Sequence, residues 1–262
     1  MSSEILTEWH NDVAVVRIAR VAKANALTRV MLVQLRNAFR KSVASGAVGV
    51  ILTGGLHLFS AGMDLGEVGN GLRDLEVDEE IRQTSEFLVG LPIPTLAAVE
   101  GRCIGAAVEI ALACDIRVVG DSADFSIPAA RLGILYRPDA IVRLVNVVGR
   151  ATAMRLLVFG ERISAADALA RGLATHAVAD GETLAVSLAL CEGLPRNTQE
   201  AVSASRRLIA GLGIAGDDVS DWEHVRRQLL SSDARVQALA RSRSGTESDG
   251  QESCGEHTQG DQ

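Results

Sequence analysis

Short apolar runs alternate with segments of helical periodicity over the first half of the chain, and this alternation constrains the fold more than any other feature. Each run has the length and β-branched content of a buried strand. Strands that alternate with helices pair largely in parallel, so the pattern predicts an α/β protein. The expected strands are residues 13–19, 48–52, 95–99 and 115–119, and the expected helices are residues 28–41, 79–89 and 105–114.

The second half of the chain is helical throughout, and the stretch Gly66–Asp78 before it reads as a polar surface loop. Residues 241–262 contain no aliphatic or aromatic side chain, so burial cannot offset their ordering entropy and we expect disorder there. The pattern predicts an α/β core followed by a helical C-terminal part and a disordered tail over residues 241–262. The expected helices are residues 138–149, 151–159, 164–171, 182–193, 197–211 and 218–240.

Composition excludes several classes of protein. The 262 residues are 47% hydrophobic, which is enough to bury a core without disulfides or metals, and the net charge of −7 argues against a general nucleic-acid binder. The N-terminus lacks a signal-peptide pattern, and no run reaches the roughly 20 apolar residues of a membrane span. The four cysteines are scattered without metal-ligand spacing. We expect a soluble, cytoplasmic protein with no membrane partner and no metal.

Glu109 is the most informative single residue. Apart from Glu109, all residues from Gly105 to Cys114 are small or apolar, so the helix has no polar face for this carboxylate to join. Burial without a full partner raises the pKa of a carboxyl group, which suits a general acid or base near neutral pH. The structural alternative is an ion pair with Arg102 or Arg117, and the residues alone leave both interpretations open.

A second candidate segment is Leu58–Leu65 (LFSAGMDL), which follows the apolar strand and a Gly-Gly turn. An Ala-Gly pair in a strand-to-loop corner allows close backbone approach to a ligand, and free N–H groups there bind an anion. The alternative is an ordinary turn. Two backbone donors together with the carboxylate of Glu109 are the groups needed to stabilise and protonate an enolate.

Five ordered motifs resemble the crotonase (enoyl-CoA hydratase/isomerase) superfamily, from about residue 5 to residue 240. Residues 59–65 resemble its F-x-A-G-x-D-L/I signature, and residues 101–115 resemble G-x-x-x-G-G-G-x-E-L/I-A-x-x-C-D. Asn25-Ala26-Leu27 matches the N-A-L that opens the first long helix, residues 125–128 match F-x-x-P, and residues 160–168 match G-x-x-I/L-x-A-x-x-A. The resemblance implies a spiral of repeated ββα units that binds acyl-CoA over residues 1–195, followed by a C-terminal helical region over residues 196–240 that assembles the chain into trimers or hexamers.

The resemblance also implies an oxyanion hole for the thioester oxygen of an acyl-CoA. Its two donors would be the backbone N–H groups of Met63 and Ala106. The family normally has three glycines where this chain has Gly105-Ala106-Ala107. Alanine keeps the same N–H at the start of a helix, while its methyl group narrows the acyl pocket.

Coenzyme A would be bound largely by the same segment. The resemblance places the adenine pocket at the backbone of Ala61, Met63 and Leu65, with Gly62 and Gly105 allowing close approach. His57 stands where the family often has a basic residue near the CoA phosphates, although a plain surface histidine is the alternative. We expect no cofactor other than the coenzyme A that the substrate carries.

The main departure from the family lies at Ala129. Glu109 matches the first of two glutamates that hydratases use to hold and activate water, and the second would directly follow Pro128, where this chain has Ala129. Movement of a proton between carbons of an enolate needs one carboxylate only. The resemblance therefore implies an acyl-CoA enzyme of fatty-acid metabolism with a single acid/base, in which full hydratase activity is doubtful.

The altered stretch after Gly133 supplies two further candidates. Tyr136 is the only tyrosine, and its phenol would donate to the substrate or simply belong to the core. Asp139 would take part in catalysis or, as the alternative, favour the first turn of a helix that begins at Pro138. A competing function is an acyl-CoA-binding protein that lost turnover with Ala129. An RNA-binding member of the same fold conflicts with the acidic charge.

Overall fold

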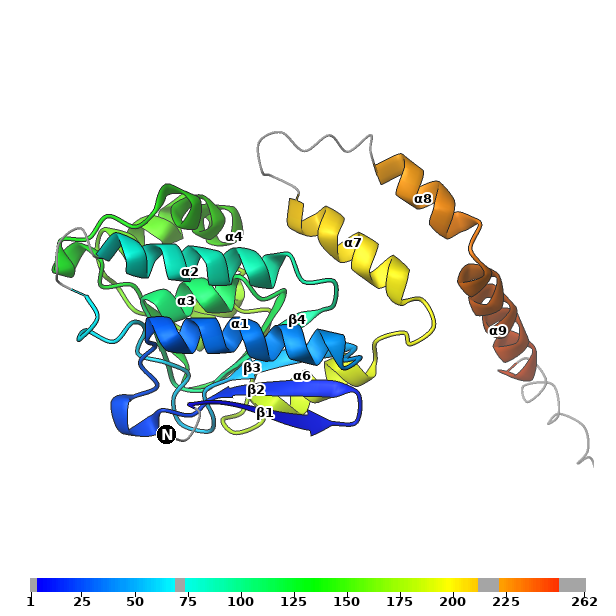
Figure 1. The fold of residues 1–262 in the computed structure, drawn as a ribbon, viewed down its shortest axis with the longest axis horizontal. Helices are drawn as coiled ribbons and strands as arrows, with labels where there is room; N and C mark the ends of the chain where they lie inside the picture. Colours follow the sequence, from blue (N-terminus) through cyan, green and yellow to red (C-terminus); the bar gives the residue numbers. More distant parts are fainter. Residues whose placement is uncertain (1–3, 69–73, 212–221, 250–262) are drawn as a thin grey trace, which may run out of the picture. The chain divides into compact units, whose positions relative to one another are not determined.

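The computed structural model describes residues 4–68, 74–211 and 222–249 (Figure 1). By their internal contacts the residues group into two units, Met1–Leu194 and Pro195–Gln262. The strands of the first unit are β1 (Ile5–His10), β2 (Val13–Ile18), β3 (Gly49–Thr53), β4 (Thr95–Val99), β5 (Arg102–Ile104), β6 (Ile116–Gly120), β7 (Asp124–Ser126), β8 (Ile163–Ser164) and β9 (His176–Val178).

The helices of the first unit are α1 (Arg29–Ala44), α2 (Asp74–Val89), α3 (Ala106–Leu112), α4 (Pro138–Leu157), α5 (Ala165–Ala170) and α6 (Thr183–Glu192). Short 3-10 turns lie at Val21–Lys23 and Ala130–Leu132. The second unit contains α7 (Gln199–Gly211), α8 (Trp222–Leu230) and α9 (Asp233–Asp249). Among the described residues, no helix is both long enough and apolar enough to cross a membrane.

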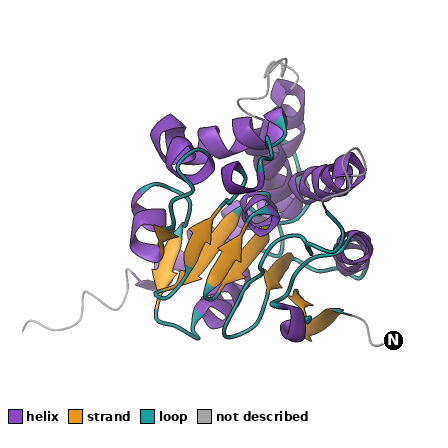
Figure 2. Cartoon of the chain, turned by 90° about the vertical axis from the view of Figure 1, so that its left-hand side faces the viewer, coloured by secondary structure: helices purple, strands orange, loops and turns teal. Residues whose placement is uncertain are grey.

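Two sheets give the first unit a spiral topology (Figure 2). The larger sheet has the order β1-β2-β3-β4-β6-β9, and all of its pairs are parallel except β1 with β2. The smaller sheet has the order β5-β7-β8, and a parallel bridge joins Ser60 to Cys103 of β5. Successive turns of the chain run through β4, β5 and α3, and then through β6, β7 and α4. Each turn thus places one strand in each sheet and then a helix.

The larger sheet is buried on both faces because side chains alternate along each strand. Ala14 and Val16 of β2 belong to the main apolar core, which also contains the buried faces of α1, α2 and α3. Val13 and Val15 belong to a second apolar cluster, which contains Cys191 of α6. Figure 1 shows α1 to α3 on one side of β2–β4 and α6 on the other. This two-sided burial explains why the strands read as continuous apolar runs.

Helix α2 begins earlier than the sequence predicts. The expected surface loop over residues 66–78 is wrong for its last five residues, since the helix starts at Asp74. Asp74 and Glu76 lie in the first turn, where negative charge interacts favourably with the helix dipole. Their polarity suggested a loop although they favour a helix start.

The predicted helix over residues 218–240 is two helices in the described part of the chain. A turn at Ser231 and Ser232 separates α8 from α9. Ser231 Oγ donates to the carbonyl of Arg227 at 3.1 Å, while Ser232 Oγ accepts from the N–H of Arg235 at 3.3 Å and so caps α9. The apolar periodicity continues across the turn, so the sequence pattern gave no sign that the helix breaks there.

The predicted disordered tail differs from the structure at its start. Residues 241–249 continue α9, whereas residues 250–262 lie outside the described part of the chain. Extension of an existing helix adds one hydrogen bond for each residue fixed, so polar residues can continue a helix that they would not nucleate.

Candidate active site

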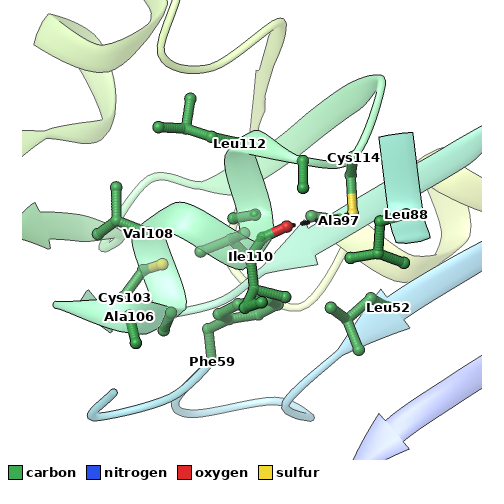
Figure 3. Close-up of a cluster of buried hydrophobic side chains, with 14 of the residues drawn as sticks. Leu52, Phe59, Leu88, Ala97, Cys103, Ala106, Val108, Ile110, Leu112 and Cys114 are labelled. Atoms are coloured by element: carbon green, nitrogen blue, oxygen red, sulfur yellow. Dashed lines mark hydrogen bonds between the residues drawn. The ribbon is translucent and has the colours of Figure 1, made fainter. Parts of the chain in front are cut away.

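Glu109 lies in the middle of helix α3, and this helix is enclosed by the core. All seven of its residues are buried. Figure 3 shows Ala106, Val108, Ile110 and Leu112 among apolar side chains of neighbouring elements. The Glu109 side chain keeps only 6% of its surface exposed. The apolar run therefore buries its one carboxylate, as the composition predicts.

Two donors hold one oxygen of this carboxylate. Arg137 Nη2 donates to Glu109 Oε1 at 2.5 Å, and Ser85 Oγ of α2 donates to the same oxygen at 3.1 Å. The other oxygen, Oε2, accepts no hydrogen bond from the described part of the chain. The carboxylate is thus fixed on one side and free on the other.

The ion-pair partners expected for Glu109 were wrong. Arg102 is exposed, and the guanidinium of Arg117 donates to the carbonyls of Leu173 at 2.6 Å and Cys114 at 2.8 Å. The actual partner, Arg137, is 28 residues distant in sequence. Only the packing of the loop before α4 against α3 brings it to Glu109.

Arg137 connects three helices at this point. Its Nη1 donates to the backbone carbonyl of Asp78 in α2 at 2.8 Å, and its Nε and Nη2 each lie 3.2 Å from the carboxylate of Asp139 in α4. Pro138 begins α4 immediately after it. Because five N–H groups in a rigid plane can bind several acceptors, an arginine suits such a junction.

Burial and charge act on Glu109 in opposite directions. Burial raises the pKa of Glu109 above its ordinary value, whereas the charge and hydrogen bond of Arg137 act to lower that pKa. Burial also raises the pKa of Asp78 and that of Tyr136, and the charge of Glu109 raises the Tyr136 pKa further. The tyrosine therefore stays a neutral phenol beside the ion pair.

The two predicted oxyanion donors lie on segments that touch. Gly62 has a φ of +87°, and a Cβ placed there would lie 2.5 Å from the carbonyl oxygen of Ile104 and 3.3 Å from the nitrogen of Ala106. The residue after Gly62 is Met63. In the described part of the chain, neither the Met63 N–H nor the Ala106 N–H donates to an acceptor. The packing of Gly62 against the start of α3 thus brings two unused donors to one region.

Asn25 builds the loop that carries Met63, a role that the sequence did not indicate. Its side-chain nitrogen donates to three backbone carbonyls of residues 54–59, the shortest at 2.8 Å to Gly54, and its own carbonyl accepts from Ser60 Oγ at 2.8 Å. Leu27 then pairs with both neighbours of Met63: its N–H donates to Gly62, and its carbonyl accepts from the Asp64 N–H. This pairing leaves the Met63 N–H unused.

The structure gives different surroundings to Tyr136 and Asp139, the two candidates that the altered loop supplies. Tyr136 is half-buried, and its hydroxyl lies 3.8 Å from the position of a Cβ at Gly105. Asp139 pairs with Arg137 and has a lowered pKa, because hydrogen bonds and the charge of Arg137 outweigh its burial. The hydroxyl of Tyr136 thus lies next to the start of α3, while Asp139 forms no hydrogen bond or ion pair with Glu109 among the described residues.

The residues expected to bind coenzyme A differ in accessibility. Leu65 is 69% exposed, His57 is exposed, and Ala61 is half-buried. Gly62 and Gly105 both have positive φ, which their positions against α3 require. Among the described residues, no group of three His, Cys, Asp or Glu side chains is arranged to hold a metal ion.

Ala129 lies beside an apolar cavity. It is 4% exposed and opens the 3-10 turn at Ala130–Leu132. The cavity has a volume of about 530 Å³ and reaches from Ala129 and Tyr136 along the side of α4. Its apolar lining includes Ala129, Ile134, Tyr136, Ile141, Val145 and Leu157.

Sequence reasoning missed two polar residues of the site, Arg137 and Ser85. The signal for Arg137 was its place beside Pro138, which fixes it at the start of a helix. Ser85 gave the weaker signal of a serine on the apolar face of α2, where it is fully buried. Neither contact follows from spacing alone.

Comparisons with known proteins agree with this architecture. The chain matches the family model of enoyl-CoA hydratase/isomerase over residues 8–210. It is 30% identical over 208 residues to 2,3-dehydroadipyl-CoA hydratase of Escherichia coli K12, a match that covers 79% of this chain and 82% of that protein. It is 31% identical over 235 residues to the probable enoyl-CoA hydratase EchA14 of Mycobacterium tuberculosis, with 88% and 91% covered.

A solved structure shows the same likeness in three dimensions. The structure is similar to that of enoyl-CoA hydratase from Bacillus anthracis with a TM-score of 0.83 at 28% sequence identity, covering 93% of this chain and 97% of that one. The predicted crotonase fold, an α/β spiral with a C-terminal helical region, is confirmed. The chain belongs to the enoyl-CoA hydratase/isomerase family of the crotonase superfamily.

Proposed function

We propose that the chain is an enzyme that acts on an acyl-CoA thioester through an enolate, with Glu109 as its single acid/base. The backbone N–H groups of Met63 and Ala106 bind the thioester oxygen, which carries the negative charge of the enolate. Glu109 Oε2 takes a proton from carbon, and the electron pair of the broken C–H bond moves into the enolate. Return of that proton to a different carbon completes an isomerisation and leaves Glu109 ionised again.

The observation that carries this proposal is the free oxygen of Glu109. Glu109 Oε2 accepts no hydrogen bond within the described residues, yet it is not sealed in the interior, whereas the unpaired Oε2 of the buried Glu100 is. The two unused N–H groups near Gly62 support the same interpretation. An enoyl-CoA substrate agrees with the names of the relatives, one of which is a 2,3-dehydroadipyl-CoA hydratase.

The alternative is a non-hydrating protein that binds acyl-CoA without turnover. Ala129 supports it, because the position expected for a second carboxylate borders an apolar cavity instead. We favour an enzyme in which this cavity takes part of the acyl chain. Tyr136 lies between the cavity and Gly105, and we propose that its phenol donates to the substrate. Asp139 acts on Arg137 instead of on the substrate.

Coenzyme A binding is proposed for the segment before α2 and the start of α3. Ala61, Gly62, Met63 and Leu65 line the adenine side, and Gly105 lets the thioester approach α3. The exposed His57 is available to the CoA phosphates. We also propose that the protein works in the cytoplasm as a homotrimer or homohexamer, without nucleic-acid or membrane partners.

A panel of enoyl-CoAs, with products identified by mass spectrometry, tests the proposed function. We expect conversion of at least one thioester, and we expect Glu109→Gln to reduce its turnover by about 100-fold or more while acyl-CoA binding survives, because the amide keeps the shape but cannot accept the proton. Binding of the thioesters without any conversion would instead establish the acyl-CoA-binding alternative. Unchanged turnover in Glu109→Gln would remove this residue from the mechanism.

A further inference from the structure

We propose that Arg137 and Ser85 are positioning residues of this site: they hold Oε1 of Glu109 so that Oε2 meets the substrate as an ionised base. This inference rests on the proposed function, since it assigns a task to the carboxylate named there. It extends that function to two residues that need not touch the substrate.

The asymmetry of the carboxylate is the first argument. Both donors, Arg137 Nη2 and Ser85 Oγ, converge on Oε1, and nothing in the described part of the chain binds Oε2. The donors come from different elements, because Arg137 precedes α4 and Ser85 lies on α2. Two donors from two directions fix the plane of the carboxylate, which a single hydrogen bond would not do.

The anchoring of Arg137 is the second argument. Its side chain is 14% exposed and is itself held by the carbonyl of Asp78 and the carboxylate of Asp139. Asp139 therefore orients the group that orients Glu109. A guanidinium with three sets of acceptors cannot follow the carboxylate if Glu109 rotates, so the geometry is imposed on Glu109.

The balance of charge around Glu109 is the third argument. Asp78 of α2 accepts a hydrogen bond from Arg137 through its backbone carbonyl, and its carboxyl group interacts with the charge of the same guanidinium. Tyr136, in the loop before α4, adds a neutral phenol. These groups do not favour an ionised Glu109. Burial opposes the ionisation of Glu109, so the base needs a nearby cation to offset the effect of burial.

Two arginines supply that positive charge. Arg137 is in direct contact, and Arg143, one to two turns along α4, also acts to lower the pKa of Glu109. The buried Nη1 of Arg143 has no hydrogen-bond partner among the described residues. Asp139 is the counter-charge on the exposed side of Arg137, with 42% of its side chain exposed. The charges of the two arginines therefore favour the carboxylate and offset part of the effect of burial, which still leaves the pKa of Glu109 above its ordinary value.

The test replaces the arginine and follows Glu109 in two independent ways. Arg137→Met removes the charge and keeps the aliphatic stem, and Arg137→Lys keeps the charge without the planar fork. Infrared difference spectra between each form and its Glu109→Gln counterpart report the ionisation of Glu109 directly. The pH dependence of kcat/KM with a 3-enoyl-CoA reports the same ionisation through turnover.

We expect Arg137→Met to move both titrations of Glu109 upward by about one to three pH units, because a nearby opposite charge favours the ionised form by that amount. The acid limb of kcat/KM then lies at higher pH, since the base must lose its proton before it can act. In Arg137→Lys the retained charge should return both titrations most of the way to those of the unmodified protein, but kcat should recover little. Ser85→Ala should lower kcat, with a smaller shift and unchanged binding of butyryl-CoA.

Arg36→Met is the matched control. Arg36 joins α1 to α2 through an ion pair with Glu80 at 2.7 Å, and its side chain is 12% exposed, which is close to the value for Arg137. Its loss should lower stability and leave both titrations in place. A titration of Glu109 that is identical in Arg137→Met and the unmodified protein would overturn the proposal, and unchanged kcat in Ser85→Ala would overturn the part given to Ser85. Absence of turnover with the infrared shift present would reject the proposed function but not the ionising role of Arg137.

Discussion

At the scale of single residues, Gly62 decides whether the two proposed oxyanion donors can meet. Its φ of +87° lies in the left-handed region that favours glycine, and its α-carbon packs on the backbone of Ile104 and Ala106. Any side chain would need space that the Ile104 carbonyl already fills. The glycine of the Ala-Gly pair thus has a physical reason: Gly62 lies so close to the backbone of Ile104 and Ala106 that no Cβ atom fits between them.

Gly62→Ala is therefore expected to be destabilising and to impair catalysis. A positive φ alone costs a non-glycine residue roughly 1–3 kcal/mol, and the contact of 2.5 Å with the Ile104 carbonyl adds to it. Thermal unfolding and turnover of the reactive enoyl-CoA measure the two effects. Gly46→Ala is the control, because Gly46 has the same φ of +87° with no atom within 4 Å of the new methyl group. Equal losses in both variants would mean that strain alone, and not the approach to α3, explains the glycine.

At the scale of elements, burial and length together decided whether the sequence could predict an element. The six-residue β1 was missed because five of its six residues are exposed. The five-residue strands β3 and β4 are buried at every position, so their apolar runs were visible. The short strands β5, β7 and β9 have three residues each, which is too few for a period of two to show. They exist because of their partners in the sheet, and a partner distant in sequence leaves no local signal.

The residues of the candidate site also fall into those that the sequence could predict and those that it could not. Glu109 was visible because a carboxylate is conspicuous in an apolar helix, and the donors at Met63 and Ala106 were inferred from motifs. Arg137 and Ser85 were not found, since their contacts depend on how α2 and α4 pack against α3. Local composition thus identifies the reactive group, whereas the groups that orient it depend on tertiary packing.

Helix α1 offers a prediction at this scale, because it starts beside the proposed oxyanion segment. Thr28 is its N-cap, with Oγ1 accepting from the N–H of Met31 at 3.2 Å, and Leu27 just before it pairs with both neighbours of Met63. Thr28→Ala should lower the free energy of unfolding by about 1 kcal/mol, since one N–H at the helix start loses its acceptor. Chemical denaturation measures this change. Thr28→Ser keeps the oxygen and should retain most of the stability; a loss equal to that of alanine would show that the methyl group, not the cap, matters.

At the scale of the whole molecule, the described residues of the second unit (195–211 and 222–249) leave apolar surface uncovered among themselves. A groove of about 1080 Å³ lies among α7, α8 and α9 and is lined by residues that include Leu208, Trp222 and Leu229. Leu230, which also lines the groove, is 40% exposed, and Ile209, outside it, is 67% exposed. Amphipathic helices with so few partners in their own unit need another surface to bury these faces.

Self-association is accordingly the expected state of the full chain in solution. Light scattering at micromolar concentration should give the mass of a trimer or a hexamer, the assembly that the family resemblance implies. Leu230→Asp should shift the mass toward the monomer, because a charge at a buried contact is left without a partner. Gln228→Asp places the same charge on the same helix at an exposed polar position and should leave the assembly intact. A monomer in the unmodified protein would contradict the prediction, and equal dissociation by both variants would mean that charge on α8, not loss of the apolar contact, separates the subunits.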